Sequence, residues 1–115
     1  MTAAAPPIQN LDSFDVVGQR IDGGVDLVVT CSGPLDASPG TLNLIERKVL
    51  ACLKTIAHEN FARVYPAAQR GPVRIFMCCE HPVSDAAGKL IDTLTSRAGL
   101  QGIALSIVKN AKDIA

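Results

Sequence analysis

The chain has 115 residues, and its 11 lysines and arginines balance its 11 aspartates and glutamates, so the formal net charge is zero. A neutral chain has no general electrostatic attraction for nucleic acid or anionic membranes, and one tyrosine and three phenylalanines without tryptophan offer little for bases to stack on. Nearly half of the residues are apolar, which is enough for one domain to build a core without metal or disulfide staples. We therefore expect neither nucleic acid nor a membrane as a partner.

Residues 1–12 are rich in alanine and proline and lack the basic and apolar regions of a secretory signal peptide. No apolar run approaches the roughly 20 residues that span a bilayer. We predict a cytoplasmic protein in which the four cysteines are reduced. The expected organisation is a flexible N-terminal segment (1–12), a single α/β domain (13–110) and a short C-terminal tail (111–115).

Two strands are predicted at the start of the domain. Residues 14–21 and 25–31 are apolar runs joined by Asp-Gly-Gly, which can supply the positive φ of a tight hairpin turn. The following segment, 32–40, reads as a loop.

The first helix is predicted to begin after Ser38, because Ser38 and Pro39 have the order of an N-cap and a first helical residue. Apolar residues then recur at three- and four-residue spacing over about five helical turns. Arg47, Lys48 and Lys54 fall outside this stripe or at its edge. The stripe consists of Leu42, Ile45, Val49, Cys52, Leu53 and Ile56.

The second half of the domain predicts a strand, a helix and a strand. Residues 62–72 contain two prolines and a glycine and read as a connector, and residues 73–79 as the third strand. Ser84 is a plausible N-cap of a second helix, for which Gly99 would be the C′ residue. Residues 102–108 form the fourth strand. The stripe of this helix consists of Ala87, Leu90, Ile91, Leu94 and Ala98.

The order ββαβαβ predicts an α/β two-layer sandwich, with a four-stranded mixed sheet and both helices packed on one face. The third strand, second helix and fourth strand should form a right-handed parallel crossover. Alternation along the strands assigns one row of each to the helices. The rows are Val25, Leu27, Val29 and Cys31; Val73, Ile75, Met77 and Cys79; and Ile103, Leu105 and Ile107.

The opposite face of the predicted sheet is mixed and only partly polar. A face this apolar is often covered by a partner or a second copy, whereas scattered apolar residues are also common on the surfaces of monomers. Both interpretations stay open. The candidate interface residues are Val28, Thr30, Phe76, Cys78, Ala104, Ser106 and Val108.

The segment FMCCEHPVSD (76–85) holds the densest cluster of reactive side chains. Neighbouring residues of a strand point to opposite faces, so Cys78 and Cys79 are poorly placed to share a metal, and no second ligand pair occurs elsewhere. Free cysteines are usually small apolar core residues. If the second and third strands are parallel neighbours, however, Cys31 and Cys79 meet at the carboxyl end of the sheet, where open α/β sheets bind ligands. Cys31, Cys79 and His81 are therefore the thiol or ligand candidates.

The chain carries no nucleophile elbow, P-loop or dinucleotide-binding glycine motif. The loop SGPLDASPG lacks the lysine and spacing of a phosphate cradle. We assign no catalytic residue, metal ligand or cofactor, and we expect no enzymatic activity.

Several segments resemble an uncharacterised family of small bacterial α/β proteins, a domain of unknown function. They are FDVVGQ, VDLVVT, LNLIERKVLACL and the connector YPAAQRGPVRI, and the likeness covers about residues 14–108. The sequence departs from that family at SGPLDASPGT, where the family has an acidic or aromatic stretch and a histidine. The family has no established activity, so the resemblance implies no functional residues.

The loop GPLDA (33–37), following two strands and preceding a helix, is similar to that of STAS domains of the anti-sigma-factor-antagonist type. Such domains place a phosphorylatable serine in an Asp-Ser-x-Gly-like turn at the start of a helix. The matching turn here is DAAG (85–88), which has no serine. The resemblance implies a regulatory binding protein.

The leading hypothesis from the sequence is a non-catalytic module that binds another protein or itself, with a homodimer as one form. The alternatives are a small-molecule, metal or thiol site at the carboxyl ends of the second and third strands, and a regulatory protein that is STAS-like or neutralises a neighbouring toxin.

Overall fold

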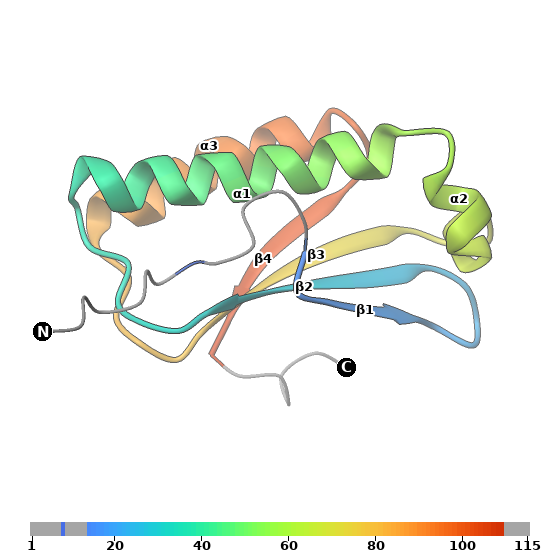
Figure 1. Cartoon of the computed structure of the whole chain (residues 1–115), viewed down its shortest axis with the longest axis horizontal. Coiled ribbons are helices and arrows are strands. Elements are labelled where there is room, and N and C mark those ends of the chain that lie inside the picture. The colour runs from blue at the N-terminus through green and yellow to red at the C-terminus, as the bar shows by residue number, and fades with distance from the viewer. Residues whose placement is uncertain (1–7, 9–13, 110–115) are drawn as a thin grey trace, which may run out of the picture.

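The computed structural model describes Ile8 and residues 14–109, and it confirms the predicted α/β sandwich of a four-stranded mixed sheet and two long helices on one face (Figure 1). In chain order the elements are β1 (Val16–Gln19), β2 (Val25–Cys31), α1 (Pro39–Ala57), α2 (Phe61–Val64), the 3₁₀ helix η1 (Pro66–Gln69), β3 (Val73–Cys79), α3 (Asp85–Gly99) and β4 (Ala104–Val108).

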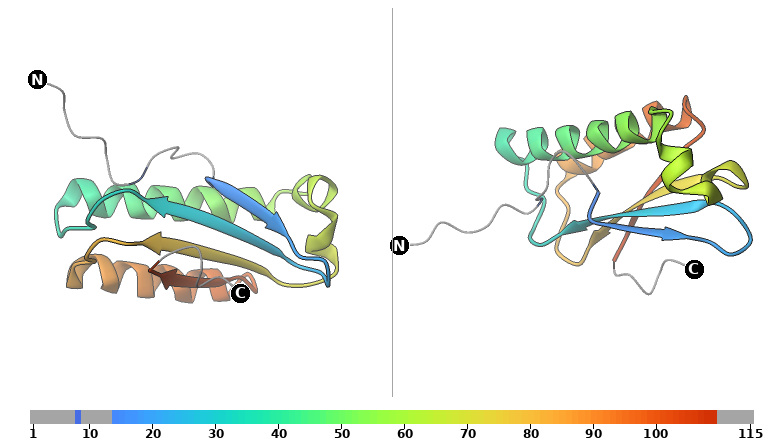
Figure 2. Two further views of the ribbon diagram at one scale, coloured as in Figure 1. Left: turned by 90° about the horizontal axis from the view of Figure 1, so that it is seen from below. Right: turned by 45° about the vertical axis from the view of Figure 1, so that its right-hand side comes forward.

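The sheet order follows the chain order, β1-β2-β3-β4. β1 pairs antiparallel with β2, and β2, β3 and β4 are parallel neighbours. Each parallel pair is joined through one long helix, so α1 and α3 lie side by side over one face (Figure 1). The view from below in Figure 2 looks onto the other face, which no described helix covers.

The core lies between the sheet and the two long helices. Alternate residues of β2, starting at Val25, are buried, and their partners in β3 are the predicted row that ends at Cys79. Each fully buried aliphatic side chain contributes about 1.5–3 kcal/mol relative to an exposed one. Two residues of the predicted rows are not buried: Val73 is half-buried, and Ile107 near the end of the edge strand β4 is 43% exposed.

Both long helices begin at the predicted caps. The Ser38 hydroxyl accepts a hydrogen bond from the Thr41 N–H, and the Ser84 hydroxyl accepts one from the Ala87 N–H. The prediction for the end of α3 was wrong, since Gly99 is its last helical residue rather than the residue after it. The left-handed residue is Gly102 (φ +73°), which is one of the four residues that separate α3 from β4.

Lys48 was expected to fall outside the apolar stripe of α1 or at its edge, yet its side chain is fully buried. Its Nζ lies 3.1 Å from one carboxylate oxygen of Asp15, and the other oxygen accepts the Thr30 N–H at 2.8 Å. The chain entering β1 therefore packs against a side of α1 that its periodicity alone assigns to solvent.

The connector before β3 is more structured than predicted, since it contains α2 and η1. It packs against the β1–β2 turn: a Cβ on Gly71 would lie 2.7 Å from the Gly24 nitrogen, so only glycine fits there. Gly24 also donates its N–H to the Ala67 carbonyl at 2.7 Å.

Ile8 lies within the segment expected to be flexible, yet its side chain is fully buried and its backbone pairs antiparallel with Cys31. The remainder of residues 1–12 and the tail 111–115 lie outside the described residues.

Candidate functional sites

Cys31 and Cys79 lie side by side at the carboxyl ends of β2 and β3. They are register partners in the parallel ladder, and their Sγ atoms are 3.4 Å apart, within hydrogen-bond distance for sulfur. Both side chains are almost completely buried on the face that carries the helices. The topology thus brings together two thiols that are 48 residues apart in the sequence.

The shared hydrogen bond makes the two thiols unequal. It lowers the pKa of Cys79, because the Cys31 S–H can donate to the Cys79 thiolate, and this effect exceeds the opposing effect of burial. The same hydrogen bond, together with burial, raises the pKa of Cys31 well above its ordinary value. The pair therefore loses its first proton at Cys79 and holds the second at Cys31.

The loops that follow the two cysteines close the carboxyl edge of the sheet. Leu35 and Val83 form a parallel bridge, in which Leu35 donates its N–H to the Pro82 carbonyl at 3.0 Å and accepts the Ser84 N–H at 2.8 Å. Leu35 is itself buried. The Asp36 carboxylate accepts hydrogen bonds from Ser38, which hold the pKa of Asp36 below its ordinary value.

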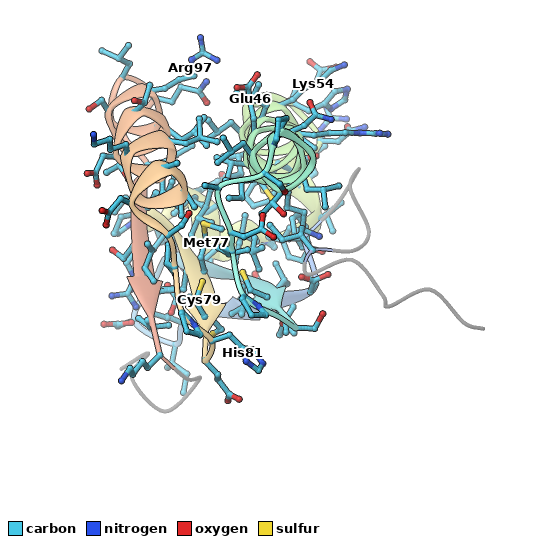
Figure 3. The ribbon with its side chains drawn as sticks, turned by 90° about the vertical axis from the view of Figure 1, so that its left-hand side faces the viewer. Glu46, Lys54, Met77, Cys79, His81 and Arg97 are labelled. Atoms are coloured by element: carbon cyan, nitrogen blue, oxygen red, sulfur yellow. The ribbon has the colours of Figure 1, made fainter. Side chains whose placement is uncertain are left out.

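His81 does not join the thiol pair. It is exposed on the loop beyond β3, whereas Met77 and Cys79 lie on the side of the sheet that faces the helices (Figure 3). In the described part of the chain, no three His, Cys, Asp or Glu side chains gather in a way that would hold a metal ion.

Open α/β sheets bind ligands in a crevice at the carboxyl edge. Such a crevice forms where neighbouring crossover helices leave toward opposite faces. Here α1 and α3 cover the same face, and the Leu35–Val83 bridge joins the loops that precede them.

The seven candidate interface residues share the face without helices, as their register shows. At its centre Phe76 and Cys78 are each only 8% exposed, and the Arg74 guanidinium lies over the Phe76 ring, 4.9 Å from its centroid. Arg74 is held there by two hydrogen bonds to Asp26, of 2.8 and 2.9 Å, which raise its pKa. Thr30, Ala104 and Ser106 are exposed, and Val28 and Val108 are half-buried.

The two edges of the sheet differ. β1 has four residues, one of them Gly18, and glycine weakens a strand. β4 (Ala104–Val108) has five residues, none of them charged and none proline, and it is hydrogen-bonded to β3 on one side. Charged residues and prolines are among the usual protections of an edge strand against pairing with another strand, and β4 carries neither.

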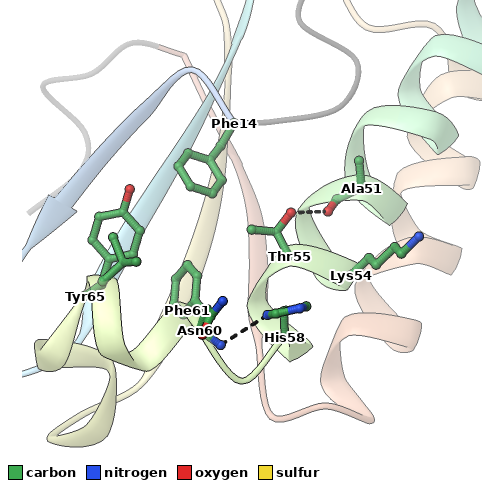
Figure 4. A pocket seen from close by; sticks show the side chains of 9 residues that line it. Phe14, Ala51, Lys54, Thr55, His58, Asn60, Phe61 and Tyr65 are labelled. Atoms are coloured by element: carbon green, nitrogen blue, oxygen red, sulfur yellow. Dashed lines mark hydrogen bonds between the residues drawn. The ribbon is translucent and has the colours of Figure 1, made fainter.

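A cavity of about 550 Å³ lies between the last turns of α1 and the short helix α2 (Figure 4). Three aromatic side chains, Phe14, Phe61 and Tyr65, form one wall. The ring centroids of Phe61 and Tyr65 are 5.1 Å apart, and those of Phe14 and Tyr65 are 6.3 Å apart. The volume is in the range of small-molecule sites.

The opposite wall of this cavity belongs to α1 and the turn after it. Ala51, Thr55 and His58 line it, and the Thr55 hydroxyl donates to the Ala51 carbonyl at 2.9 Å. The His58 Nδ1 accepts the Asn60 N–H at 3.1 Å, which leaves Nε2 as the ring nitrogen free to carry the proton of the neutral side chain. Figure 4 shows the Lys54 side chain running along the outer side of α1.

The sequence alone did not reveal this cavity, since residues 62–72 read as a connector and His58 as a solvated helix end. One signal was present: three of the chain's aromatic residues (one tyrosine, three phenylalanines in total) lie at positions 14, 61 and 65. Their convergence depends on the tertiary contact between the chain before β1 and α2.

Comparison of the chain with protein-family models, with curated proteins and with solved structures found no match. Among the helices of the described residues, none has the length and apolar character needed to cross a bilayer.

Proposed function

We propose that the chain is a non-catalytic module that associates with a second copy of itself through the β4 edge and the adjoining open face. The observation that carries the proposal is β4, an apolar, uncharged edge strand without a protecting proline or bulge-forming glycine. Two such edges can pair antiparallel about a two-fold axis and extend both sheets into one.

Charge favours a second copy as the occupant. The formal net charge is zero, so two copies approach without long-range repulsion. The open face beside β4 presents Ala104 and Ser106, small side chains that allow close approach of another strand or sheet.

Sedimentation equilibrium of three proteins tests this proposal. The wild type should dimerise, and Ile107→Lys should be monomeric because it places a charge on the edge strand. Leu100→Lys is the matched control, because Leu100 is also an exposed apolar residue (89% exposed) but lies in the turn before β4. A wild type that stays monomeric at every concentration, or variants that behave alike, would sink the proposal.

The resemblance to STAS domains supports the same class of function, protein binding without catalysis. Asp85 begins α3 as the corresponding turn requires, but Ala86 and Ala87 follow it where a phosphorylatable serine would be needed. Control by phosphorylation of this turn is therefore not part of the proposal.

The cavity of about 550 Å³ favours a second candidate function, binding of a small organic molecule with an aromatic body. An aromatic ligand would pack edge-to-face against Phe61 and Tyr65, and a hydroxyl or carbonyl on it could reach the imidazole of His58.

Tyr65 supplies a specific readout for this candidate, because the chain has one tyrosine and no tryptophan. Titration with phenylbutanol should change the Tyr65 fluorescence saturably, and Phe61→Ala should weaken binding. Leu100→Ala, far from the cavity in sequence and outside its lining, is the control. A linear, non-saturating response would remove the candidate.

A further inference from the structure

We propose that Cys31 and Cys79 form a peroxide-sensitive dithiol, which closes to a disulfide between the ends of β2 and β3 and reopens on reduction. This inference is independent of the proposed self-association. It assigns an oxidative modification site to two buried cysteines that would otherwise be interpreted as apolar core residues.

Geometry is the first support. The two residues are register partners on adjacent parallel strands, which are about 4.8 Å apart, and disulfides span Cα separations of about 4.4–6.8 Å. Their Sγ atoms already lie 3.4 Å apart, so bond formation requires a small approach of the sulfurs and no rearrangement of the fold.

The unequal thiols provide the second support. Cys79 is the thiol that ionises first, stabilised by the Cys31 S–H, and the thiolate is the reactive form. Cys31 keeps its proton while its neighbour is charged. Each sulfur therefore has a distinct role, one attacking the oxidant and the other resolving the product.

The reaction balances with hydrogen peroxide as the oxidant. The Cys79 thiolate attacks one peroxide oxygen, an S–O bond forms, the O–O bond breaks, and hydroxide leaves to take up a proton as water. The resulting sulfenic acid is neutral. The negative charge of the Cys79 thiolate, which kept Cys31 protonated, is therefore lost. The Cys31 sulfur then attacks the Cys79 sulfur, the S–O bond breaks, and its oxygen leaves as water with the Cys31 proton. Two thiols supply two electrons, and one peroxide gives two waters.

Burial selects the oxidant. Cys31 is 4% exposed and Cys79 is 5% exposed, and the bridged loops 32–38 and 80–84 follow directly after them. A small neutral peroxide can reach such a pair, whereas a bulky disulfide such as oxidised glutathione is excluded. Cys52 is fully buried on α1, where burial raises its pKa to about 11, so it remains a thiol.

The test treats the folded protein with hydrogen peroxide and then counts thiols in urea. The wild type, with four free cysteines, should lose two thiols, and its mass should fall by two hydrogens. Peptide mapping should link Cys31 to Cys79, and reductant should restore all four thiols. Oxidised glutathione at the same concentration should change nothing.

Three variants sharpen the test. Cys52→Ala is the control and should still lose two thiols. Cys31→Ala should accumulate a sulfenic acid at Cys79 that dimedone traps, and Cys79→Ala should resist oxidation at Cys31. The inference is overturned if the wild type keeps four thiols, if the mapped bond joins another pair, or if oxidation requires urea. The mapping uses the wild type alone, so it decides the question even if a variant fails to fold.

Discussion

The carboxyl edge of the sheet and the aromatic cavity behind α1 are opposites in construction. At the carboxyl edge the reactive side chains are buried against each other, and the Leu35–Val83 bridge joins the loops above them. The cavity has space for a ligand but is lined mainly by apolar and aromatic side chains. The difference teaches that the two buried thiols and the space for a ligand lie in different places in this fold, and that the cavity carries its own polar side chains, among them His58 and Lys54.

The largest expected effect on stability comes from breaking the Asp15–Lys48 ion pair, which anchors the chain next to Phe14 in the cavity wall. Asp15→Ala would remove the carboxylate that pairs with the buried Lys48 ammonium, and breaking such a buried ion pair costs about 3–5 kcal/mol of unfolding free energy. Urea denaturation measures the loss. The double variant Asp15→Ala/Lys48→Met, which removes both charges, should recover most of it, and equal losses in the two proteins would contradict the role of the ion pair.

Oxidation should stabilise the closed edge. A disulfide between residues 48 apart restricts the unfolded chain by about 4 kcal/mol in the chain-entropy account, less any strain in the native bond. Urea denaturation of the mapped oxidised protein against the reduced protein measures the difference. An oxidised form less stable than the reduced one would show that the strand ends must distort to form the bond.

Alkaline pH should lower the stability of the core through the buried Cys52 of α1. Burial raises the pKa of Cys52 from 9.0 to about 11, so between these values the unfolded chain has lost a proton that the native state keeps. The unfolding free energy should therefore fall with rising pH, by about 2–3 kcal/mol from this residue. Urea denaturation can be measured from about pH 8 to about pH 11, which covers most of the range between the two pKa values. The unfolding free energy of Cys52→Ala should fall less steeply with pH than that of the wild type. If the unfolding free energies of the two proteins fell in parallel with pH, the raised pKa of Cys52 would be refuted.

The smallest expected effect concerns the helix starts at the closed edge. Ser84→Ala removes the acceptor for the Ala87 N–H, and Ser38→Ala removes the acceptor for the Thr41 N–H. Each should cost about 1 kcal/mol of unfolding free energy. Ser96→Ala, on the exposed part of α3, is the control and should change stability little. Equal losses at all three positions would indicate that capping contributes nothing.

Local patterns in the sequence predicted most of the fold. Strands β2 and β3 were placed to the residue, and both N-caps were found, because alternation and capping are local signals. The expected proximity of Cys31 and Cys79 followed from parallel pairing alone. The burial of Lys48 and the cavity were missed, because both depend on how the chain before β1 packs across α1 and α2, which no local pattern records.

Amide hydrogen exchange at residue resolution tests the contrast between the two regions most directly. The Leu35 and Ser84 amides, which are hydrogen-bonded across the bridged loops, should exchange slowly. The amides of Arg63 and Val64, in the four-residue helix beside the cavity, should exchange much faster because so short a helix opens locally. Slow exchange at α2 together with fast exchange at Leu35 and Ser84 would contradict a closed carboxyl edge and an accessible cavity.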